Sequence, residues 1–252
     1  MARYDFRSPR LFVDASLGEG AALPLAPNQA NYLVNVLRLK PGAPVLVFNG
    51  RNGEWRAELG VARKKGVELI VIERVREQTE PGDLHYLFSP LKHARLDYMV
   101  QKAVEMGASR LQPVIMRHTQ TERVNLDRMR ANAIEAAEQC GILTIPDIGA
   151  PLTLDAFVQG WVPERLLVFC DEEADVKDPI AALRDARDPV AIGPQRVTLL
   201  IGPEGGFAGE ERAALLELAN VVRLALGPRI LRADTAAVAA LALVQAVLGD
   251  WC

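Results

Sequence analysis

The stretch LLIGPEGGFAGEE, residues 199–211, passes from an apolar segment through three glycines into a segment typical of a helix. A glycine-rich turn between a strand and a helix often binds phosphate through backbone N–H groups. The Lys-Ser or Lys-Thr pair of a Walker A loop is absent here, and a Pro-Glu pair after the first glycine breaks the Rossmann spacing. Glu204 would also repel a phosphate. The loop therefore suits a cationic ligand, or a neutral one with polar edges.

Strands and helices alternate in the part of the chain that contains this loop. Apolar segments typical of strands occupy residues 84–90, 110–116, 165–170 and 196–201, and helical patterns occupy residues 94–107 and 125–141. This alternation predicts an α/β domain with a mainly parallel sheet covered by helices. The ligand of such a sheet is expected at the carboxyl ends of its strands.

The first 76 residues follow a different pattern. Short β-like segments at residues 10–13, 43–50, 53–62 and 67–75 are separated by turns, with one helical segment at residues 28–39. This pattern predicts a small, partly closed β barrel. The polar segment REQTEPGD, residues 76–83, is typical of a boundary, so we expect one domain over residues 1–76 and a second over residues 77–252.

Charge is distributed unevenly between these two parts. The whole chain of 252 residues has a formal net charge of −3. Residues 1–76 contain 12 Lys and Arg against 7 Asp and Glu, a balance of +5, which leaves −8 for the remainder. The basic excess includes the RKK run at residues 63–65. It is compatible with binding to nucleic acid and equally with a solvated surface.

Several other classes of protein are not indicated. The sequence contains no apolar run approaching the roughly 20 residues that span a bilayer and no signal-peptide pattern, so we expect a cytoplasmic protein without a membrane partner. Cys140, Cys170 and Cys252 show no paired spacing, and the three histidines show no ligand spacing. We therefore expect neither disulfides nor a metal.

A second motif, LALGPRILRADTAAVAALALVQAVLGD at residues 224–250, repeats the order of apolar segment, Gly-Pro turn and helix. The pair of motifs resembles the SPOUT methyltransferases, and IGPEGGF with LGPRILRADT is similar to their RsmE-type branch, which methylates N3 of a uridine in 16S ribosomal RNA. VLRLKPG, FNG, LKHARLDYMVQKAVEMGASRLQPV and EAAEQCG extend the resemblance along most of the chain.

The resemblance implies a PUA-like RNA-binding β barrel followed by an α/β domain in which a deep trefoil knot holds S-adenosylmethionine (SAM). It also implies a homodimer whose partner is 16S rRNA or the small ribosomal subunit. The implied cofactor-binding residues lie in two loops: Ile201, Gly202, Pro203, Glu204, Gly205 and Gly206, then Leu226, Gly227, Pro228, Ile230, Leu231 and Arg232. Glycine allows close approach of the backbone to a ligand. Glu204 either contacts the cofactor or braces the loop.

Two residues at the start of the last helix are the catalytic candidates. Arg232 is assigned to the uridine or to an adjacent phosphate, with a structural ion pair as the alternative. Asp234 stands where the family usually has glutamate, and it is either a general base or a helix N-cap. Loss of the imide proton must accompany methylation at N3, so the site must stabilise negative charge on the base.

Basic residues matching the family pattern are the RNA-contact candidates, namely Arg7, Arg10, Arg38, Lys92 and Arg95. Asn31-Tyr32 replaces a histidine often found upstream of the VLRLKPG motif. The last helix, residues 236–248, is apolar all round, which predicts burial within its own domain or against a second subunit. Two other functions stay open: methylation of another RNA atom such as a ribose 2′-oxygen, and non-catalytic RNA binding in ribosome assembly.

Overall fold

The computed structural model describes residues 7–61, 66–121, 123–175, 178–188 and 193–251. The RKK run at residues 63–65 lies outside these ranges. The chain forms two compact units, one made of residues 1–80 with 137–144 and the other of residues 81–136 with 145–252.

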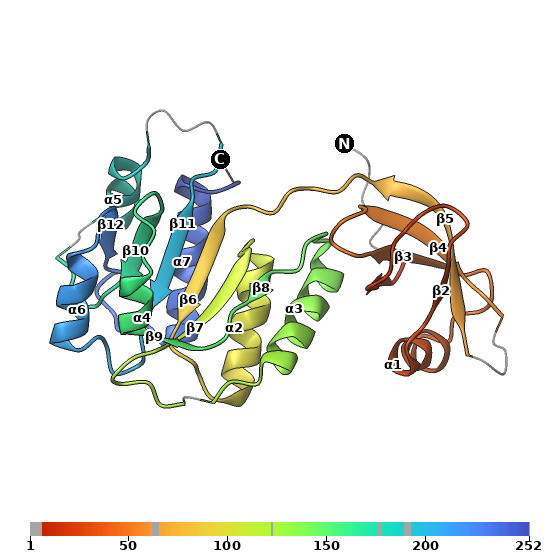
Figure 1. Ribbon diagram of the computed structural model, residues 1–252, viewed down its shortest axis with the longest axis horizontal. Helices are drawn as coiled ribbons and strands as arrows, with labels where there is room; N and C mark the ends of the chain where they lie inside the picture. The colour runs from red at the N-terminus through yellow and green to blue at the C-terminus, as the bar shows by residue number, and fades with distance from the viewer. Residues whose placement is uncertain (1–6, 62–65, 122, 176–177, 189–192, 252) are drawn as a thin grey trace. The chain divides into compact units, whose positions relative to one another are not determined.

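The first unit is built on a curled five-stranded sheet (Figure 1). Its strands are β1 (Arg10–Phe12), β2 (Ala22–Pro24), β3 (Pro44–Phe48), β4 (Glu54–Leu59) and β5 (Glu68–Arg76). They lie in the order β1-β3-β4-β5-β2, and only β1 and β3 run parallel. Apolar side chains of all five strands form one buried core, including Leu11, Val45 and Leu69. The predicted front barrel is confirmed as a curled sheet, and β2 was not predicted.

The helical segment of this unit changes its geometry midway. An α-helix, α1 (Pro27–Asn31), continues directly into a π-helix, η1 (Tyr32–Val36). Arg38 follows with a φ of 55°, a left-handed conformation that is uncommon for a residue with a side chain. Tyr32, Val36 and Leu37 are all exposed here. This segment therefore combines strained backbone with uncovered apolar side chains.

The second unit contains a sheet whose described pairings are all parallel, as predicted. Its strands are β6 (Leu84–Phe88), β7 (Arg110–Ile115), β8 (Asp147–Ile148), β9 (Leu152–Thr153), β10 (Leu166–Cys170), β11 (Val197–Ile201) and β12 (Val221–Leu224). The main order is β12-β10-β11-β6-β7-β8, and β9 pairs with β7. The short strands β8 and β9 were not predicted, because a strand of two residues is too short to show alternation of apolar and polar side chains.

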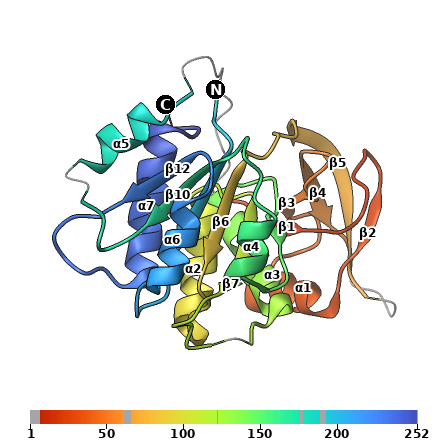
Figure 2. The same cartoon turned by 60° about the vertical axis from the view of Figure 1, so that its left-hand side comes forward.

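Helices cover both faces of this sheet, which explains why the central strand β11 is buried along its whole length (Figure 2). They are α2 (His93–Glu105), α3 (Leu126–Cys140), α4 (Leu154–Gln159), α5 (Pro179–Asp185), α6 (Gly209–Leu216) and α7 (Ala233–Val247). On one face Tyr86 meets Met99 of α2, and α2 packs against α7. On the other, Leu87 and Leu200 share a core with residues of α4 and α6, such as Leu154 and Leu215.

The strand order brings the two glycine-rich loops together. The first loop follows β11 and the second follows β12, and β10 lies between these two strands in the sheet. Because the three strands are parallel, their carboxyl ends meet at one edge. Both loops and the residues after β10 therefore converge on one place, where a ligand of an open α/β sheet is expected.

Candidate functional site

The converging loops enclose a cavity of about 400 Å³. Eleven of the twelve predicted cofactor-binding residues line it, namely Ile201, Gly202, Pro203, Glu204, Gly205, Gly206, Leu226, Gly227, Pro228, Ile230 and Leu231. Cys170, Asp171, Glu172 and Phe207 also line it, together with Arg229, Ala233 and Ala236. Cys170 to Glu172 follow β10 directly. Sequence reasoning missed them, although polar residues right after a buried parallel strand were the available signal.

Glycine is required at two points of the cavity wall for different reasons. Gly206 has a φ of 72°, and a Cβ there would lie 2.2 Å from the Glu172 carboxylate. Gly227 has a φ of 91°, but no described heavy atom lies within 4 Å of where its Cβ would stand. The first glycine thus allows close packing of the protein against itself, and the second leaves open space beside the loop.

The carboxyl end of β10 supplies negative charge to the cavity. Asp171 accepts hydrogen bonds from Arg212 at 2.7 Å and from Arg223 at 2.8 Å. Burial raises the pKa of Asp171, but the bonds from these two arginines outweigh it and hold that pKa below its usual value. Asp171 is therefore ionised and neutralised. Among the described residues none donates a hydrogen bond to the exposed carboxylate of its neighbour Glu172.

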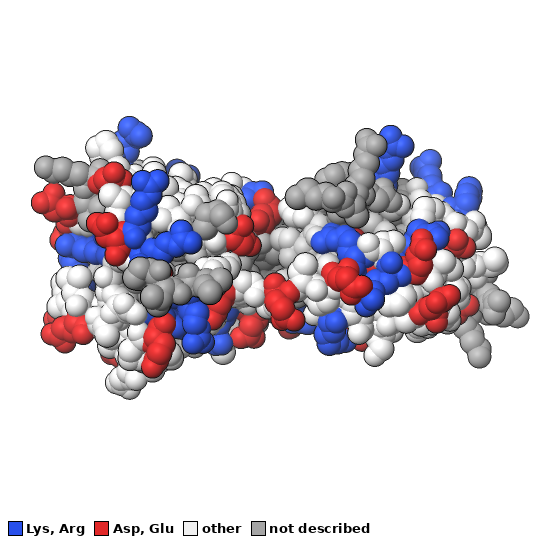
Figure 3. Space-filling model, turned by 90° about the horizontal axis from the view of Figure 1, so that it is seen from above, with Lys and Arg blue, Asp and Glu red and all other residues white. Residues whose placement is uncertain are grey.

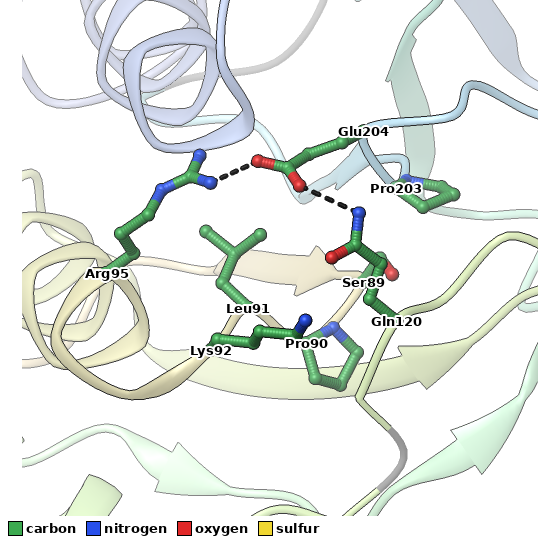
Figure 4. Close-up of a pocket in the computed structure, with 8 residues that line it drawn as sticks. All are labelled: Ser89, Pro90, Leu91, Lys92, Arg95, Gln120, Pro203 and Glu204. Atoms are coloured by element: carbon green, nitrogen blue, oxygen red, sulfur yellow. Dashed lines mark hydrogen bonds and ion pairs between the residues drawn. The ribbon is translucent and has the colours of Figure 1, made fainter.

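Arg95 on α2 links the first loop to the start of α7. Its Nε donates to the Asp234 carboxylate at 3.0 Å, and another of its nitrogens bonds to Glu204 (Figure 4). Gln120 donates to the second oxygen of Glu204 at 3.1 Å. Hydrogen bonds to Asp234 and then to Glu204 raise the pKa of Arg95 above its usual value, so the group stays charged. Glu204 therefore braces the loop in this structure.

A shallow pocket of about 40 Å³ lies beside the cavity and shares Pro203 and Glu204 with it (Figure 4). Its other lining residues are Ser89, Pro90, Leu91, Lys92, Arg95 and Gln120. Lys92 directly precedes α2, and it has no carboxylate partner among the described residues. Of the two cations here, Arg95 is thus occupied by carboxylates and Lys92 is not.

The two catalytic candidates occupy different positions at the start of α7. Arg232 is the N-cap residue, and its exposed side chain lines neither pocket as far as the described residues define them. Asp234 lies in the first helical turn and accepts from Arg95 and from the backbone N–H of Thr235. The hydrogen bond from Arg95 lowers the pKa of Asp234 below its usual value, which does not favour a general base.

The RNA-contact candidates of the first unit also differ in setting. Arg10 is buried, with 7% of its surface exposed, and it bonds to Glu54 at 2.6 Å and to the backbone oxygens of residues 137, 138 and 142. Burial of this guanidinium does not favour contact with RNA. Arg7 and Arg38 are exposed. Arg38 stands beside the uncovered side chains of η1, a setting that suits contact with unstacked bases.

The basic excess of the first unit does not form a uniform patch on the face shown in Figure 3, where blue and red side chains are interspersed over the right-hand part. Several arginines of this unit are also held in ion pairs. Arg56 pairs with Glu73 at 2.9 Å, and Arg74 pairs with Glu77 at 2.7 Å. The net positive charge therefore overstates the number of cations available to a polyanion.

Two family models match the chain in the order that the fold suggests. The model for an RNA methyltransferase PUA domain matches residues 25–72, and the model for an RNA methyltransferase domain matches residues 78–245. The fold, the cavity and these matches define an RNA methyltransferase that carries a PUA-like domain. The predicted fold class of a PUA-like domain followed by an α/β domain is thereby confirmed.

Individual relatives narrow this class. The chain is 32% identical to Ribosomal RNA small subunit methyltransferase E of Synechocystis over 90% of its own length and 74% of the relative's. It is 28% identical to the enzyme of the same name from Rickettsia conorii, over 96% and 97% of the two chains. The chain belongs to the Ribosomal RNA small subunit methyltransferase E family.

A solved structure agrees with this assignment over the full chain. The Neisseria gonorrhoeae enzyme of that name, bound to S-adenosyl methionine, superposes with a TM-score of 0.82 at 26% identity, over 98% of this chain and 100% of that one. In the part of the chain that the structure describes, no helix has the length and apolar character to cross a membrane. No cluster of His, Cys, Asp or Glu suited to a metal occurs among the same residues.

Proposed function

We propose that this protein transfers a methyl group from SAM to N3 of a uridine in the 16S RNA of the small ribosomal subunit. One observation carries the proposal. The two glycine-rich loops, 20 or more residues apart in sequence, line one cavity at the carboxyl edge of the sheet, in a chain of a family whose relatives methylate this RNA. SAM supplies an electrophilic methyl on a positively charged sulfur.

The cavity fits SAM in size, charge and backbone access. Its volume of about 400 Å³ lies in the range of about 300–1,000 Å³ typical of sites for small ligands. Asp171 and Glu204 are paired with arginines that do not line the cavity, and Glu172 adds an acidic side chain without such a pair among the described residues, which suits a sulfonium. Open space at Gly227 gives a ligand access to peptide groups of the second loop.

Chemistry at N3 requires the base to lose its imide proton and the resulting charge to be stabilised. Asp234 is held ionised by Arg95, so we assign it to positioning the start of α7. A role as general base is the alternative for Asp234, and Asp234→Asn tests it, because asparagine caps a helix but cannot accept the proton. Burial raises the pKa of Cys170 to about 12, so this thiol lining the cavity stays protonated and is no nucleophile. Arg232 is assigned to the uridine or an adjacent phosphate.

The division of labour follows the two predicted domains. We propose that residues 1–76 contribute RNA affinity through Arg7 and Arg38, and that residues 77–252 bind SAM and carry out the transfer in the cytoplasm. A deep trefoil knot around the two loops, implied by the resemblance to the SPOUT methyltransferases, belongs to the same proposal.

A homodimer is also part of the proposal, and α7 supports it. Buried residues such as Leu241 and Val244 cover one side of this helix. Its other side, with Ala239, Ala242, Leu243 and Ala246, lines an open apolar groove of about 570 Å³ together with Leu226 and Trp251. The predicted all-round burial is thus incomplete within one chain, and a second copy seated here would complete it. Leu243→Asp should yield monomers in sedimentation, whereas Leu216→Asp on exposed α6 should not.

The decisive experiment transfers tritiated methyl groups from SAM to small subunits and to free 16S RNA from a strain lacking this enzyme, followed by mass spectrometry of the product nucleoside. N3-methyluridine is expected. A ribose 2′-O-methyl nucleoside would show that the acceptor is the ribose 2′-oxygen and not N3. Binding of RNA without any transfer would favour a non-catalytic assembly factor.

A further inference from the structure

Resting on this proposed function, we infer that the shallow pocket lined by Ser89, Lys92 and Gln120 receives the imide edge of the acceptor pyrimidine, and that the Lys92 ammonium stabilises the N3 anion. The pocket and the cofactor cavity share Pro203 and Glu204 (Figure 4). A base edge held here therefore lies across one wall from the cavity proposed for SAM.

The size and polarity of the pocket suit an edge of a planar base. About 40 Å³ is too little for a nucleoside but admits the carbonyl oxygens that flank N3. Pro90, Leu91 and Pro203 supply apolar walls. Donors come from the Lys92 ammonium and from the Gln120 amide, which is oriented because it already donates to Glu204 at 3.1 Å. The buried Ser89 hydroxyl is shared with the Thr119 hydroxyl at 2.9 Å. Both O2 and O4 of uracil are acceptors, so donor and acceptor types match.

Charge decides which residue acts on the anion. Arg95 is shared between Glu204 and Asp234, so these three groups together carry a charge of −1. A sulfonium bound next to them would bring the sum to zero. An N3 anion entering beside Glu204 then needs a further cation, and Lys92 is the cation of this pocket that no described carboxylate neutralises. Arg232 lines neither pocket, so of the two assignments proposed for it, the uridine and an adjacent phosphate, this inference uses the phosphate.

The chemical step is balanced without another reactant. The N3–H proton passes to solvent, and the N3 lone pair forms a bond to the methyl carbon. The bond between that carbon and sulfur breaks with its electrons on sulfur. The products are N3-methyluridine, the neutral thioether S-adenosylhomocysteine and one proton. At pH values below the N3 pKa of the bound base, the rate should therefore rise with pH.

The first test measures single-turnover methyl transfer across pH with saturating SAM and 16S RNA. Lys92→Met should move the rising limb of the profile up by about one pH unit, which is about tenfold in rate at neutral pH, with recovery at high pH. Lys92→Arg, which keeps the charge, should restore most of the rate. Lys102→Met makes the same change at the far end of α2 and should have no effect.

Other charged or titratable groups near this pocket are Arg95 on α2, Glu204 after β11, Asp234 on α7 and His118 after β7, whose ring contacts the Gly206 carbonyl. The variant His118→Gln should leave the rising limb of the pH–rate profile unchanged. This result would show that the limb reports ionisation of the pyrimidine and not of His118. A loss of rate in Lys92→Met that is equal at every pH would overturn the inference, because it would show that Lys92 does not act on ionisation.

A second test does not depend on turnover. RNA carrying 4-thiouridine at the methylated position is irradiated on the enzyme in the presence of S-adenosylhomocysteine, and the crosslinked peptide is identified by mass spectrometry. We expect crosslinks to residues 89–92 or 120, with SAM affinity unchanged in Lys92→Met by calorimetry. Crosslinks elsewhere would overturn the inference. Absence of N3 methylation by the wild type would instead reject the proposed function.

Discussion

Two arginine–carboxylate clusters, one in each unit, use the same groups for opposite purposes. In the first unit Glu54, 1% exposed, accepts from Arg10 and from Arg76. In the second unit the proportions are reversed, because Arg95 bridges Glu204 and Asp234 with about a third of its side chain exposed. The buried cluster stabilises the fold of the first unit, whereas the half-exposed one joins a loop to the start of a helix beside a cavity. Burial, not residue type, separates the two roles.

The largest effect should come from breaking the buried cluster. Arg10→Met leaves the Glu54 carboxylate with Arg76 alone in an apolar surrounding, and removing one partner of a buried pair costs about 3–5 kcal/mol. We expect the first unit to unfold at a much lower denaturant concentration. Hydrogen exchange of the β3 and β4 amides measures this unfolding. Arg51→Met serves as the control, since its pair with Asp14 is exposed and worth about 0–1 kcal/mol. Equal losses in both variants would contradict the comparison.

Breaking the half-exposed cluster should affect ligand binding more than stability. Arg95→Gln releases Glu204 and the start of α7, so we expect SAM affinity to fall by about tenfold, or about 1.4 kcal/mol. Calorimetry gives the affinity, and thermal melting gives the stability. The double variant Arg95→Gln with Glu204→Gln should lose no more SAM affinity than Arg95→Gln alone, because both substitutions remove the same ion pair between Arg95 and Glu204. Additive losses would show that the two residues act separately.

A substitution on helix α7 tests whether the cavity binds SAM. Ala236→Leu on α7 adds bulk inside the cavity and should weaken SAM binding several-fold without unfolding the protein. Ala213→Leu makes the same change at an exposed position of α6 that does not line it. Unaltered SAM affinity in a folded Ala236→Leu protein would place the cofactor elsewhere.

RNA binding should distinguish an exposed arginine from the buried one. Arg38→Ala should reduce the salt dependence of 16S RNA binding by a log–log slope of about 0.7–0.9 if one phosphate contact is lost. Affinity for SAM should not change. If Arg38→Ala keeps the wild-type salt dependence, Arg38 does not contact the RNA.

The smallest effect concerns pH and the cluster of Asp83, His85 and Arg165 at the amino edge of the second sheet. Burial, with the nearby Arg165, lowers the pKa of His85 from 6.5 to about 4. As the pH falls, His85 is protonated in the unfolded chain before it is protonated in the folded one. The contribution of His85 to the free energy of unfolding is therefore fully present above pH 6.5 and declines as the pH falls toward 4. The melting temperature should drop by a few degrees over this window, and His85→Gln should flatten the drop.

Periodic features of the sequence predicted most of the fold. The long strands and α2, α3 and α7 were predicted because apolar spacing reports burial, and the loops because Gly-Pro turns interrupt it. The partners of Arg10 and Arg95 were not predictable, since their carboxylates lie 44 and 109 or more residues away and no local pattern encodes such pairing. Glu172 was missed for a similar reason, because its place in the cavity depends on the order of β10, β11 and β12.

That strand order has a consequence for folding. β11 pairs with β6, more than 100 residues earlier, and β10 must lie between β11 and β12 before the two loops meet. Parallel pairing over such separations requires closure of long loops and is intrinsically slow. The ligand cavity is therefore assembled only after the most distant contacts of the second unit have formed. A chain that binds SAM has completed its slowest step, so the kinetics of cofactor binding during refolding would report the final assembly of the sheet.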